Sequence, residues 1–485
     1  MKKYIIIPVI GLLIFSYTTH AQTKSFKRGT CFNNLLVEDI EALSPGLSWA
    51  YNWALTSGNY DNFKNNGVEY LPMIWNRVNV TNARNFLSTR PEIKYILTFN
   101  EPNFKSQANL TPVEAARQWP EIEEIANEFN LTIVGPAVNY SPDKDPFEWY
   151  DEFFAACPDC RVDHIAVHLY MPSASSIRTS IEKFKKYGRP IWLTEFCAWE
   201  NATTAKSQKQ LLVDAFDYLE TDPDIIRYAW FKERGAGGGH PYYQLLDQKN
   251  EGVLTELGEI FTYMSSYDDN FYFTTGIQIP SEHYIRMNRV NMEKTTDESG
   301  HINLSGMNAP LSWVDYNLDI PESGEYNIFF RLSAEYGDDS EVYVSVNGVE
   351  AASMLFEKKG VGVWNTQSCK GTFSEGKQKI RIGFKKGGLR LNWWAITKNN
   401  DAPSAVEIPV TTGDRKVYPN PVTDILHIQP ADNISGLILS DINGRTLFER
   451  QNANDIDMTG YRQGIYLLTI KFSDGETIVK KVIKQ

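Results

Sequence analysis

The sequence is short of positive charge: 48 lysine and arginine residues stand against 60 aspartate and glutamate residues, for a net charge of −12. A protein that binds nucleic acid or an anionic membrane needs a basic surface to neutralise phosphates. We therefore exclude nucleic acid as a partner. Long apolar runs are scarce too, because beyond the N-terminus no stretch approaches the roughly 20 residues of a membrane-spanning helix. The mature protein is predicted to have no transmembrane span.

Cysteine is also sparse, and its five residues cannot all pair with one another. Cys157 and Cys160, in "ACPDC", are typical of a small surface disulfide loop. Cys31, Cys197 and Cys369 are predicted to be lone, partly buried thiols. A zinc site would need a second ligand pair at metal spacing, which the sequence lacks. No metal is therefore predicted for catalysis.

The N-terminus combines two lysines, an apolar stretch from Tyr4 to Phe15 and a small residue, Ala21, at a cleavage position. This pattern predicts a secretory signal peptide over residues 1–21. The alternative is a membrane anchor, but the apolar stretch is too short to span a bilayer. We expect an exported protein.

From residue 24 to 267 the chain alternates apolar strands with amphipathic helices. One predicted helix covers 111–130, where Thr111 caps the first turn, Pro112 occupies it and Glu114 completes a capping box; another covers 206–220. Eight apolar strands with crossover helices favour an α/β fold of the (β/α)8 TIM-barrel type over an open sheet, although periodicity alone cannot show closure. The predicted strands are 28–32, 47–53, 69–75, 95–103, 132–139, 163–170, 190–196 and 226–234.

Polar and aromatic side chains occupy the carboxyl ends of these strands, which is where a barrel of this type builds its site. Glu101 ends the fourth strand and Glu195 ends the seventh, on opposite sides of a closed barrel. Two carboxyl groups about 5–5.5 Å apart across a glycosidic bond perform double displacement, one as nucleophile and one as acid. We expect apolar neighbours and the second carboxylate to favour the protonated form of Glu101.

Other strand ends supply candidate substrate contacts. Asn100 is placed to bind a sugar 2-hydroxyl. His168 and Tyr170 share one strand face and are predicted to orient the nucleophile, although a structural histidine is the alternative for His168. The remaining candidates are an amide and three indoles that suit sugar stacking, each indole having core packing as its alternative: Asn139, Trp53, Trp75 and Trp230.

The motifs "FNEP" and "WLTEF" resemble clan-A retaining glycoside hydrolases, and "WAYNW", "EYLPMIW", "HIAVHLY" and "PIWLTEF" in this order resemble glycoside hydrolase family 128. The resemblance covers about residues 27–265. It implies endo-cleavage of β-1,3-glucan with retention, with Glu101 as acid/base and Glu195 as nucleophile. Phe99 departs from the tryptophan that the family often has before "NEP".

Residues 271–397 change to short alternating strands with polar turns, which predicts an antiparallel β-sandwich. The segment "SWVDYNLDIPESGEYNIFFRLSA" and the closing "LNWWAI" resemble a family 6 carbohydrate-binding module. The resemblance implies sugar contacts by Trp364 and Asn392 and a structural calcium with Glu282 as candidate ligand. A packing domain without ligand is the alternative.

A polar linker is predicted over 398–414 and a small β domain over 415–485. "VYPNPVTDILHI" and "GIYLLTIKFSDGETIVKKVIKQ" resemble the sorting domain of the type IX secretion system. The resemblance implies the secretion machinery as a partner and a secreted or cell-surface protein.

Together these patterns predict a secreted retaining endo-glucanase that acts on β-1,3-glucan such as laminarin or curdlan and needs no catalytic cofactor. Two alternatives stay open. One is a retaining endo-hydrolase of another polysaccharide, such as mannan, xylan or an algal galactan. The other is a non-catalytic glycan-binding protein of the cell surface.

Overall fold

The structure is a computed structural model. The predicted signal peptide (1–21) and almost all of the predicted linker lie outside the residues it describes. The described residues are 22–484 without the following gaps: 200–201, 236–241, 308–311, 337–339, 399–402, 404–415, 419, 421, 430–433, 442–444, 452 and 473–476.

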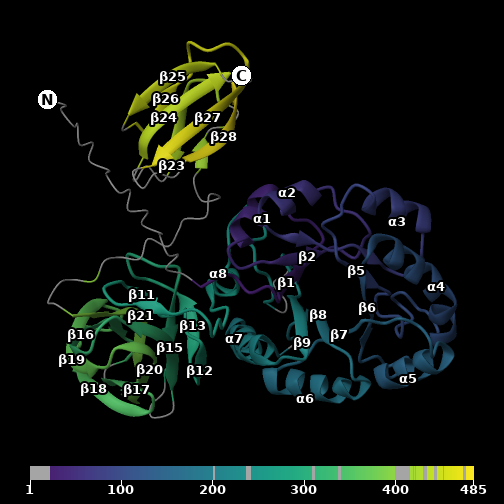
Figure 1. The fold of residues 1–485 in the computed structure, drawn as a ribbon, viewed down its shortest axis with the longest axis horizontal. Helices are drawn as coiled ribbons and strands as arrows, with labels where there is room; N and C mark the ends of the chain where they lie inside the picture. Colours follow the sequence, from purple (N-terminus) through teal and green to yellow (C-terminus); the bar gives the residue numbers. More distant parts are fainter. Residues whose placement is uncertain are drawn as a thin grey trace, which may run out of the picture.

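The first half of the chain forms a parallel sheet that curls into a barrel, with helices around the outside (Figure 1). The strand order is β3-β2-β1-β9-β8-β7-β6-β5-β4. The strands are β1 (Arg28–Cys31), β2 (Trp49–Tyr51), β3 (Glu69–Tyr70), β4 (Met73–Ile74), β5 (Tyr95–Thr98), β6 (Thr132–Asn139), β7 (His164–Leu169), β8 (Ile191–Phe196) and β9 (Ile225–Trp230).

The sheet closes through one predicted strand, 69–75, which the structure divides into β3 and β4. β3 pairs with β2, whereas β4 pairs with β5 on the other side. Pro72 lies between the halves and has no N–H for the ladder, but its carbonyl still accepts from Leu97 at 2.9 Å. The same seven residues therefore bond both neighbouring strands, and the predicted eight-stranded barrel is confirmed.

The helices follow the strands around the barrel wall. In α4, Thr111 accepts from the Glu114 N–H and the Glu114 carboxylate accepts from the Thr111 N–H, so the predicted capping box is confirmed. Cys157 and Cys160, just after α5, are bonded as predicted. The helices are α1 (Val37–Leu43), α2 (Tyr60–Asn65), α3 (Val80–Leu87), α4 (Pro112–Phe129), α5 (Pro146–Ala156), α6 (Ala174–Phe184), α7 (Ala205–Thr221) and α8 (Glu256–Tyr263), with a 3-10 turn at Lys185–Tyr187.

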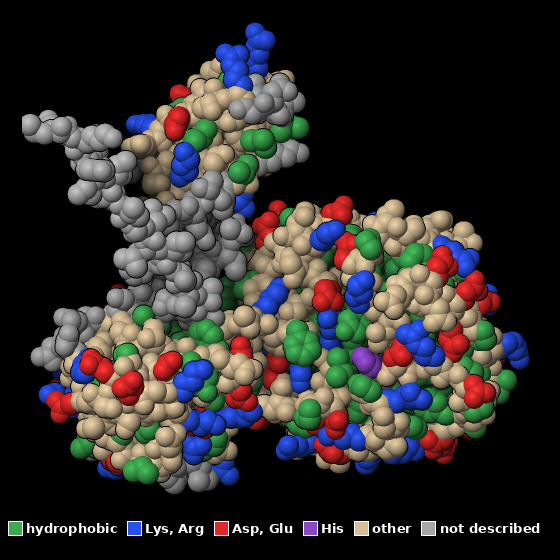
Figure 2. All heavy atoms as spheres, viewed as in Figure 1, with side chains coloured by type: hydrophobic (Ala, Val, Ile, Leu, Met, Phe, Trp, Pro, Cys, Tyr) green, Lys and Arg blue, Asp and Glu red, His purple; other side chains and the backbone are tan. Residues whose placement is uncertain are grey.

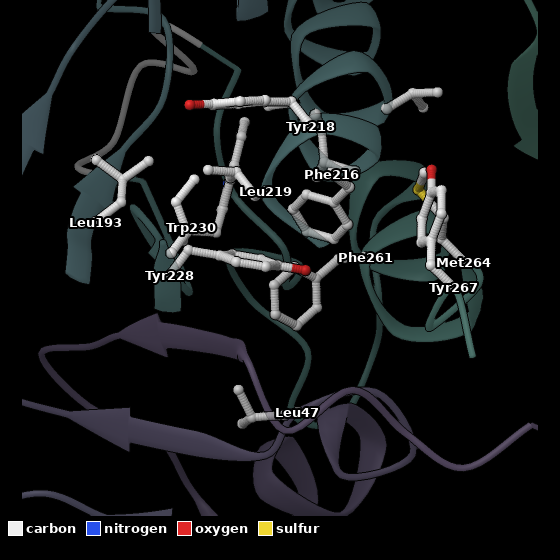
Figure 3. Packing of buried hydrophobic residues seen from close by; sticks show 14 of the residues in the cluster. Leu47, Leu193, Phe216, Tyr218, Leu219, Tyr228, Trp230, Phe261, Met264 and Tyr267 are labelled. Atoms are coloured by element: carbon white, nitrogen blue, oxygen red, sulfur yellow. The ribbon is translucent and has the colours of Figure 1, made fainter. Parts of the chain in front are cut away.

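Alternation along the strands produces two apolar layers in the barrel. One layer fills the barrel interior and includes Trp49, Tyr51, Trp192 and Ala229. The other lies between the sheet and the helices; Figure 3 shows part of it, where Tyr228 and Phe216 belong to β9 and α7. The rigid wall that results holds the strand ends in fixed positions.

The second domain is a sandwich of two sheets, as the sequence predicts. One sheet has the order β10-β15-β20-β17-β18 with β12 beside β15, and the other β13-β14-β21-β16-β19 with β11 beside β21. The strands are β10 (Phe273–Thr274), β11 (Ile279–Pro280), β12 (Arg286–Asn288), β13 (Asn291–Lys294), β14 (Ile302–Ser305), β15 (Trp313–Ile320), β16 (Gly324–Ala334), β17 (Ser340–Val346), β18 (Val349–Phe356), β19 (Asn365–Phe373), β20 (Gly376–Lys386) and β21 (Leu389–Thr397).

The sandwich packs directly on helices α7 and α8 of the barrel (Figure 1). Lys294 forms an ion pair with Glu259 at 2.7 Å, and the His301 ring stacks on Tyr263 with centroids 3.6 Å apart. One apolar cluster runs through both domains without interruption. Barrel and sandwich therefore share a core.

The C-terminal domain has two small sheets and an apolar cluster of its own. Acidic and basic side chains are interspersed over the face that Figure 2 shows. No helix in the described part of the chain is long and apolar enough to cross a membrane. The strands are β22 (Lys416–Tyr418), β23 (Ile425–Gln429), β24 (Ile434–Asp441), β25 (Thr446–Gln451), β26 (Asp455–Asp457), β27 (Gly464–Phe472) and β28 (Thr477–Lys484).

Candidate active site

The chain bends sharply where β5 ends, and the bend brings Glu101 to the barrel mouth. Phe99 and Glu101 have φ angles of +35° and +43°, which non-glycine residues rarely adopt. Hydrogen bonds to both neighbouring strands hold this backbone: the Phe99 N–H donates to Ile74 and the Glu101 N–H to Ala137, each at 2.7 Å. Strain of this kind is typical of functional sites.

Asn103 fixes the loop that follows. Its side-chain amide donates to the carbonyls of Asn139 at 2.6 Å and Lys144 at 2.9 Å. The loop after β5 is thereby tied to the end of β6. Both neighbours of this strand end therefore help to position Glu101.

Glu101 and Glu195 converge on one point above the barrel interior. A carboxylate oxygen of each and a ring nitrogen of His168 all lie within 4.8 Å of one another. Both carboxylates are nearly buried, with 7% and 4% of their surfaces exposed. Two carboxyl groups this close can both reach one glycosidic bond.

Three side chains donate hydrogen bonds to Glu195, and His168 lies beside them. Its Oε1 accepts from Tyr51 Oη at 3.0 Å and from Trp53 Nε1 at 2.6 Å. Its Oε2 accepts from the Tyr170 hydroxyl and lies 3.3 Å from His168 Nδ1. Burial, reinforced by the Glu195 charge, raises the pKa of both tyrosine hydroxyls well above their usual value, so they stay protonated donors.

Glu101 has two donors on Oε1, Asn139 Nδ2 at 2.8 Å and His168 Nδ1 at 2.9 Å. Burial alone would raise the Glu101 pKa, but the bond and charge of His168, together with the Asn139 bond, lower it below its usual value. The expectation of a favoured protonated Glu101 is therefore wrong for the free protein, because it omitted His168. Burial alone would lower the pKa of His168. The charges of Glu195 and Glu101 and the hydrogen bond to Glu101 outweigh burial, so the pKa of His168 is raised above its usual value.

His168 lies beneath the pair and is completely buried. Its Nδ1 faces both carboxylates, whereas Nε2 has no partner in the described part of the chain. Glu101, His168 and Glu195 are close enough to hold a cation. Both carboxylates already accept hydrogen bonds from N–H and O–H groups, and a bound cation would have to displace these donors.

A cavity of about 480 Å³ opens above the carboxylates. Its walls combine aromatic rings with polar groups, as sugar sites do. The lining residues are Asn33, Trp53, Trp75, Asn100, Glu101, Phe104, Ser106, Gln107, Asn139, Tyr170, Glu195, Trp199, Phe231 and Lys232.

Three segments of this chain match models of known protein families. The glycosyl hydrolase catalytic core model matches residues 29–261, the family 6 carbohydrate-binding module 281–398, and the secretion system C-terminal sorting domain 416–485.

Two solved family 128 endo-β-1,3-glucanases align with the barrel over nearly their whole length. The one from Pseudomonas viridiflava is 35% identical and covers 50% of this chain and 98% of its own, with a TM-score of 0.47. The one from Sorangium cellulosum is 38% identical and covers 49% and 97%, with a TM-score of 0.45. The barrel belongs to glycoside hydrolase family 128.

A curated relative of the family 128 barrel is the alkali-sensitive linkage protein 1 of Schizosaccharomyces pombe. It is 30% identical over 235 residues, which are 45% of this chain and 41% of that protein. The chain thus spans about two fifths of the length of this relative.

Most of the residues predicted to contact substrate line the cavity of the family 128 barrel, but several of them hydrogen-bond the two carboxylates. Trp53 and Tyr170 bond Glu195, and Asn139 bonds Glu101. Asn100 lines the cavity, where its amide donates to Gln107 at 3.3 Å and its Oδ1 has no partner among described residues. Trp75 lines the wall without a hydrogen bond to either carboxylate in the described structure.

The structure also contradicts the prediction for Trp230. The alternation of β9 points Ala229 into the barrel and Trp230 outward, between the sheet and the helices (Figure 3). Its Nε1 donates to the Tyr243 carbonyl at 2.8 Å, so Trp230 is a core residue. The next residue, Phe231, lines the cavity instead.

Sequence reasoning missed the loop residues of the cavity, among them Trp199. Trp199 is 48% exposed, and its ring stacks on Tyr243 with centroids 5.2 Å apart. An exposed tryptophan three residues past a strand end is the signal that could have identified it. Asn33 and Lys232, from the loops after β1 and β9, carried no comparable signal.

In the sandwich, Trp364 and Asn392 both contact the loop between β13 and β14. Trp364 Nε1 donates to Thr296 Oγ1 at 3.0 Å. The Asn392 amide donates to Asp297 at 2.8 Å and to the Ser299 carbonyl at 2.9 Å. The two residues are brought together, although the Asn392 donors are engaged within the protein.

Glu282, the candidate calcium ligand, lies buried in the sandwich with Oε2 unpartnered among described residues. Burial raises its pKa to about 8. A free carboxyl oxygen fits a hard cation that takes its other ligands from backbone carbonyls. Calcium at this place stays a proposal.

Proposed function

We propose that the protein is a secreted glycoside hydrolase that cleaves internal β-1,3-glucosidic bonds of β-glucan with retention of configuration. The observation that carries the proposal is the pair of carboxylate oxygens within 4.8 Å. Retaining enzymes hold their carboxyl groups about 5–5.5 Å apart, whereas inverting enzymes need about 6.5–9.5 Å to admit a water.

Glu195 is the nucleophile in this proposal. Its oxygen bonds the anomeric carbon while the bond from that carbon to the leaving oxygen breaks. Tyr51, Trp53 and Tyr170 fix the carboxylate in place for attack. Because the three donors are held by the barrel wall, the attacking oxygen needs little reorganisation.

Glu101 is the acid and then the base. It gives a proton to the leaving oxygen, and afterwards it takes a proton from the water that displaces Glu195 from the anomeric carbon. In the free protein His168 Nδ1 lies 2.9 Å from Glu101 Oε1, and we assign it a proton because the two carboxylates raise the His168 pKa. We infer that this proton passes to Glu101 when bound substrate replaces water around the pair.

Endo action and a β-1,3 linkage are supported by the relatives. The endo-β-1,3-glucanases from Pseudomonas viridiflava and Sorangium cellulosum are 35% and 38% identical. A curdlan-specific exo-β-1,3-glucanase of the same family, from Blastomyces gilchristii, is only 26% identical. The sandwich would hold the glucan, and the C-terminal domain would direct export through the type IX secretion machinery.

Product sizing on a polysaccharide panel tests this proposal. Laminarin and curdlan should release a ladder of oligosaccharides from the earliest time points, whereas β-1,4-mannan, xylan and algal galactan should release none. Release from one of those three alone would overturn the substrate. Release of only glucose or one short product from laminarin would overturn endo action.

A further inference from the structure

A second cavity of about 380 Å³ adjoins the catalytic one. Asn33 and Lys232 line both cavities, so they form the boundary between them. The second cavity lies between the loops after β1 and β9. The residues that line it are Asn33, Asn34, Leu36, Lys232, Glu233, Arg234, Gly235, Gln248, Lys249 and Glu251.

Lys232 stands at the boundary, and its ammonium makes no direct polar contact with the described residues. Its residue surface is only 9% exposed, and no hydrogen bond or ion pair of its ammonium occurs among the described residues. Nζ lies 5.8 Å from the Trp53 ring centre and 5.5 Å from that of Phe231. Ring contacts offset only part of the cost of burying an ammonium, so its N–H donors are available to a ligand.

Glu233 organises the wall of this second cavity. Its Oε1 accepts from the backbone N–H groups of Asn33 at 2.8 Å and Asn34 at 3.3 Å. Its Oε2 is buried and has no partner in the described part of the chain. The loop after β1 is therefore fixed in place by an acid whose second oxygen is still unsatisfied, next to an unpaired lysine.

The charges around the cavity balance. Arg234 is neutralised by two hydrogen bonds to Asp39, at 2.7 and 2.6 Å. Lys232 and Glu233 carry opposite charges, as do the rim residues Lys249 and Glu251. A wall with polar groups but no excess charge suits a neutral ligand rich in hydroxyl groups rather than an anion.

We propose that the second cavity is a sugar subsite, in which Lys232 hydrogen-bonds the hydroxyl groups of the glucose unit next to the one at Glu195. Trp53 contacts both Glu195 and Lys232, so the cavity adjoins the side that keeps the sugar after cleavage. This inference rests on the proposed function. It makes Lys232 a specificity-determining residue for chain length.

Two aryl substrates isolate this subsite. An aryl β-glucoside places one sugar on the Glu195 side of the bond, and an aryl β-laminaribioside places two, with the same leaving group. Lys232→Met should lower kcat/KM on the bioside by about tenfold to a hundredfold, since a hydrogen bond to a charged group contributes about 1.5–3 kcal/mol. On the glucoside the change should stay below about threefold.

Lys94→Met is the matched control, because Lys94 is exposed just before β5, at the opposite end of the barrel. It should leave both rates within about twofold. Asn33→Ala, at the same boundary, should show a smaller selective loss on the bioside and serves if Lys232→Met lowers the melting temperature.

The outcomes separate this inference from the proposed function. Equal losses on both substrates would show that Lys232 acts on the carboxylates, and no loss on either would remove the subsite. A wild-type protein that hydrolyses neither substrate and no β-1,3-glucan would overturn the proposed function itself.

Discussion

The barrel and the sandwich each bury carboxyl groups, but in opposite surroundings. In the barrel, Glu195 accepts from Tyr51, Trp53 and Tyr170, and a histidine lies 3.3 Å away. In the sandwich, Glu282 is equally buried, but its Oε2 has no partner among described residues, and burial raises its pKa to about 8.

The difference teaches that burial alone does not make a catalytic carboxylate. Desolvation favours the neutral acid at Glu282, and by itself would do the same at Glu101. At Glu101 the bonds from His168 and Asn139 favour the charged form instead, and the donors around the carboxylate pair come from the ends of β2, β6 and β7 and the loop after β2. A set of donors gathered from separate strands is what a closed barrel provides.

The largest effect should come from removing the nucleophile. Glu195→Ala should lower kcat on laminarin by at least about 10⁴-fold, as loss of a nucleophile does elsewhere. Glycan binding, measured by affinity electrophoresis, should survive. Glu148→Ala, at an exposed position in the first turn of α5, is the control. Retained turnover in Glu195→Ala would make the carboxylate a bystander.

Glu101→Gln should have the next largest effect, and one that depends on the leaving group. Loss of a general acid costs about 10²–10⁴-fold. That loss should appear with laminarin, whose leaving group must be protonated, and should shrink for the glycosylation step with a dinitrophenyl glycoside. Steady-state and burst kinetics on both substrates measure it. Equal losses in the glycosylation step would contradict the acid role.

His168→Gln should change the pH profile of kcat/KM. His168 has a raised pKa and holds the proton near Glu101, so the alkaline limb of the wild type reports loss of that proton. Without the histidine the proton must reside on a carboxyl, which releases it at lower pH. We expect the alkaline limb to move to lower pH; an unmoved limb would leave His168 a packing residue.

The smallest effect concerns stability in the sandwich. Folded Glu282 has a pKa of about 8, against an ordinary value of 4.5, so the folded state keeps a proton that the unfolded state releases. Stability from this group is full below about pH 4.5 and falls as pH rises toward 8, by up to about 1.4 kcal/mol per pH unit.

Chemical unfolding of wild type and Glu282→Gln across this range measures the slope, which the variant should lack. We expect calcium to abolish the wild-type slope, because a bound cation keeps the carboxylate charged. If neither the slope nor the melting temperature changes when calcium or a chelator is added, the calcium proposal is wrong.

The sequence located Glu101 and Glu195 because parallel strands in a closed barrel bring their carboxyl ends together. It could not show the positive φ angles of Phe99 and Glu101, which depend on hydrogen bonds to strands distant in sequence. The prediction for Trp230 is wrong because side chains alternate along β9, so an error of one residue moves a side chain from the inner to the outer face of the sheet.

Loop residues were harder still to predict. Trp199 and Lys232 follow strands whose apolar pattern ends before them, and their place at the cavity depends on where the loops fold back. The protonation of Glu101 was predicted in the wrong direction, since the contact with His168 joins positions 67 residues apart.

The anomeric configuration of the first product tests the central claim most directly. Proton NMR during hydrolysis of laminarin oligosaccharides should show the β-anomer appearing first, with the α-anomer arising later by mutarotation. Initial release of the α-anomer would mean single displacement by water, and would contradict the assignment of Glu195 as a nucleophile that acts in concert with Glu101.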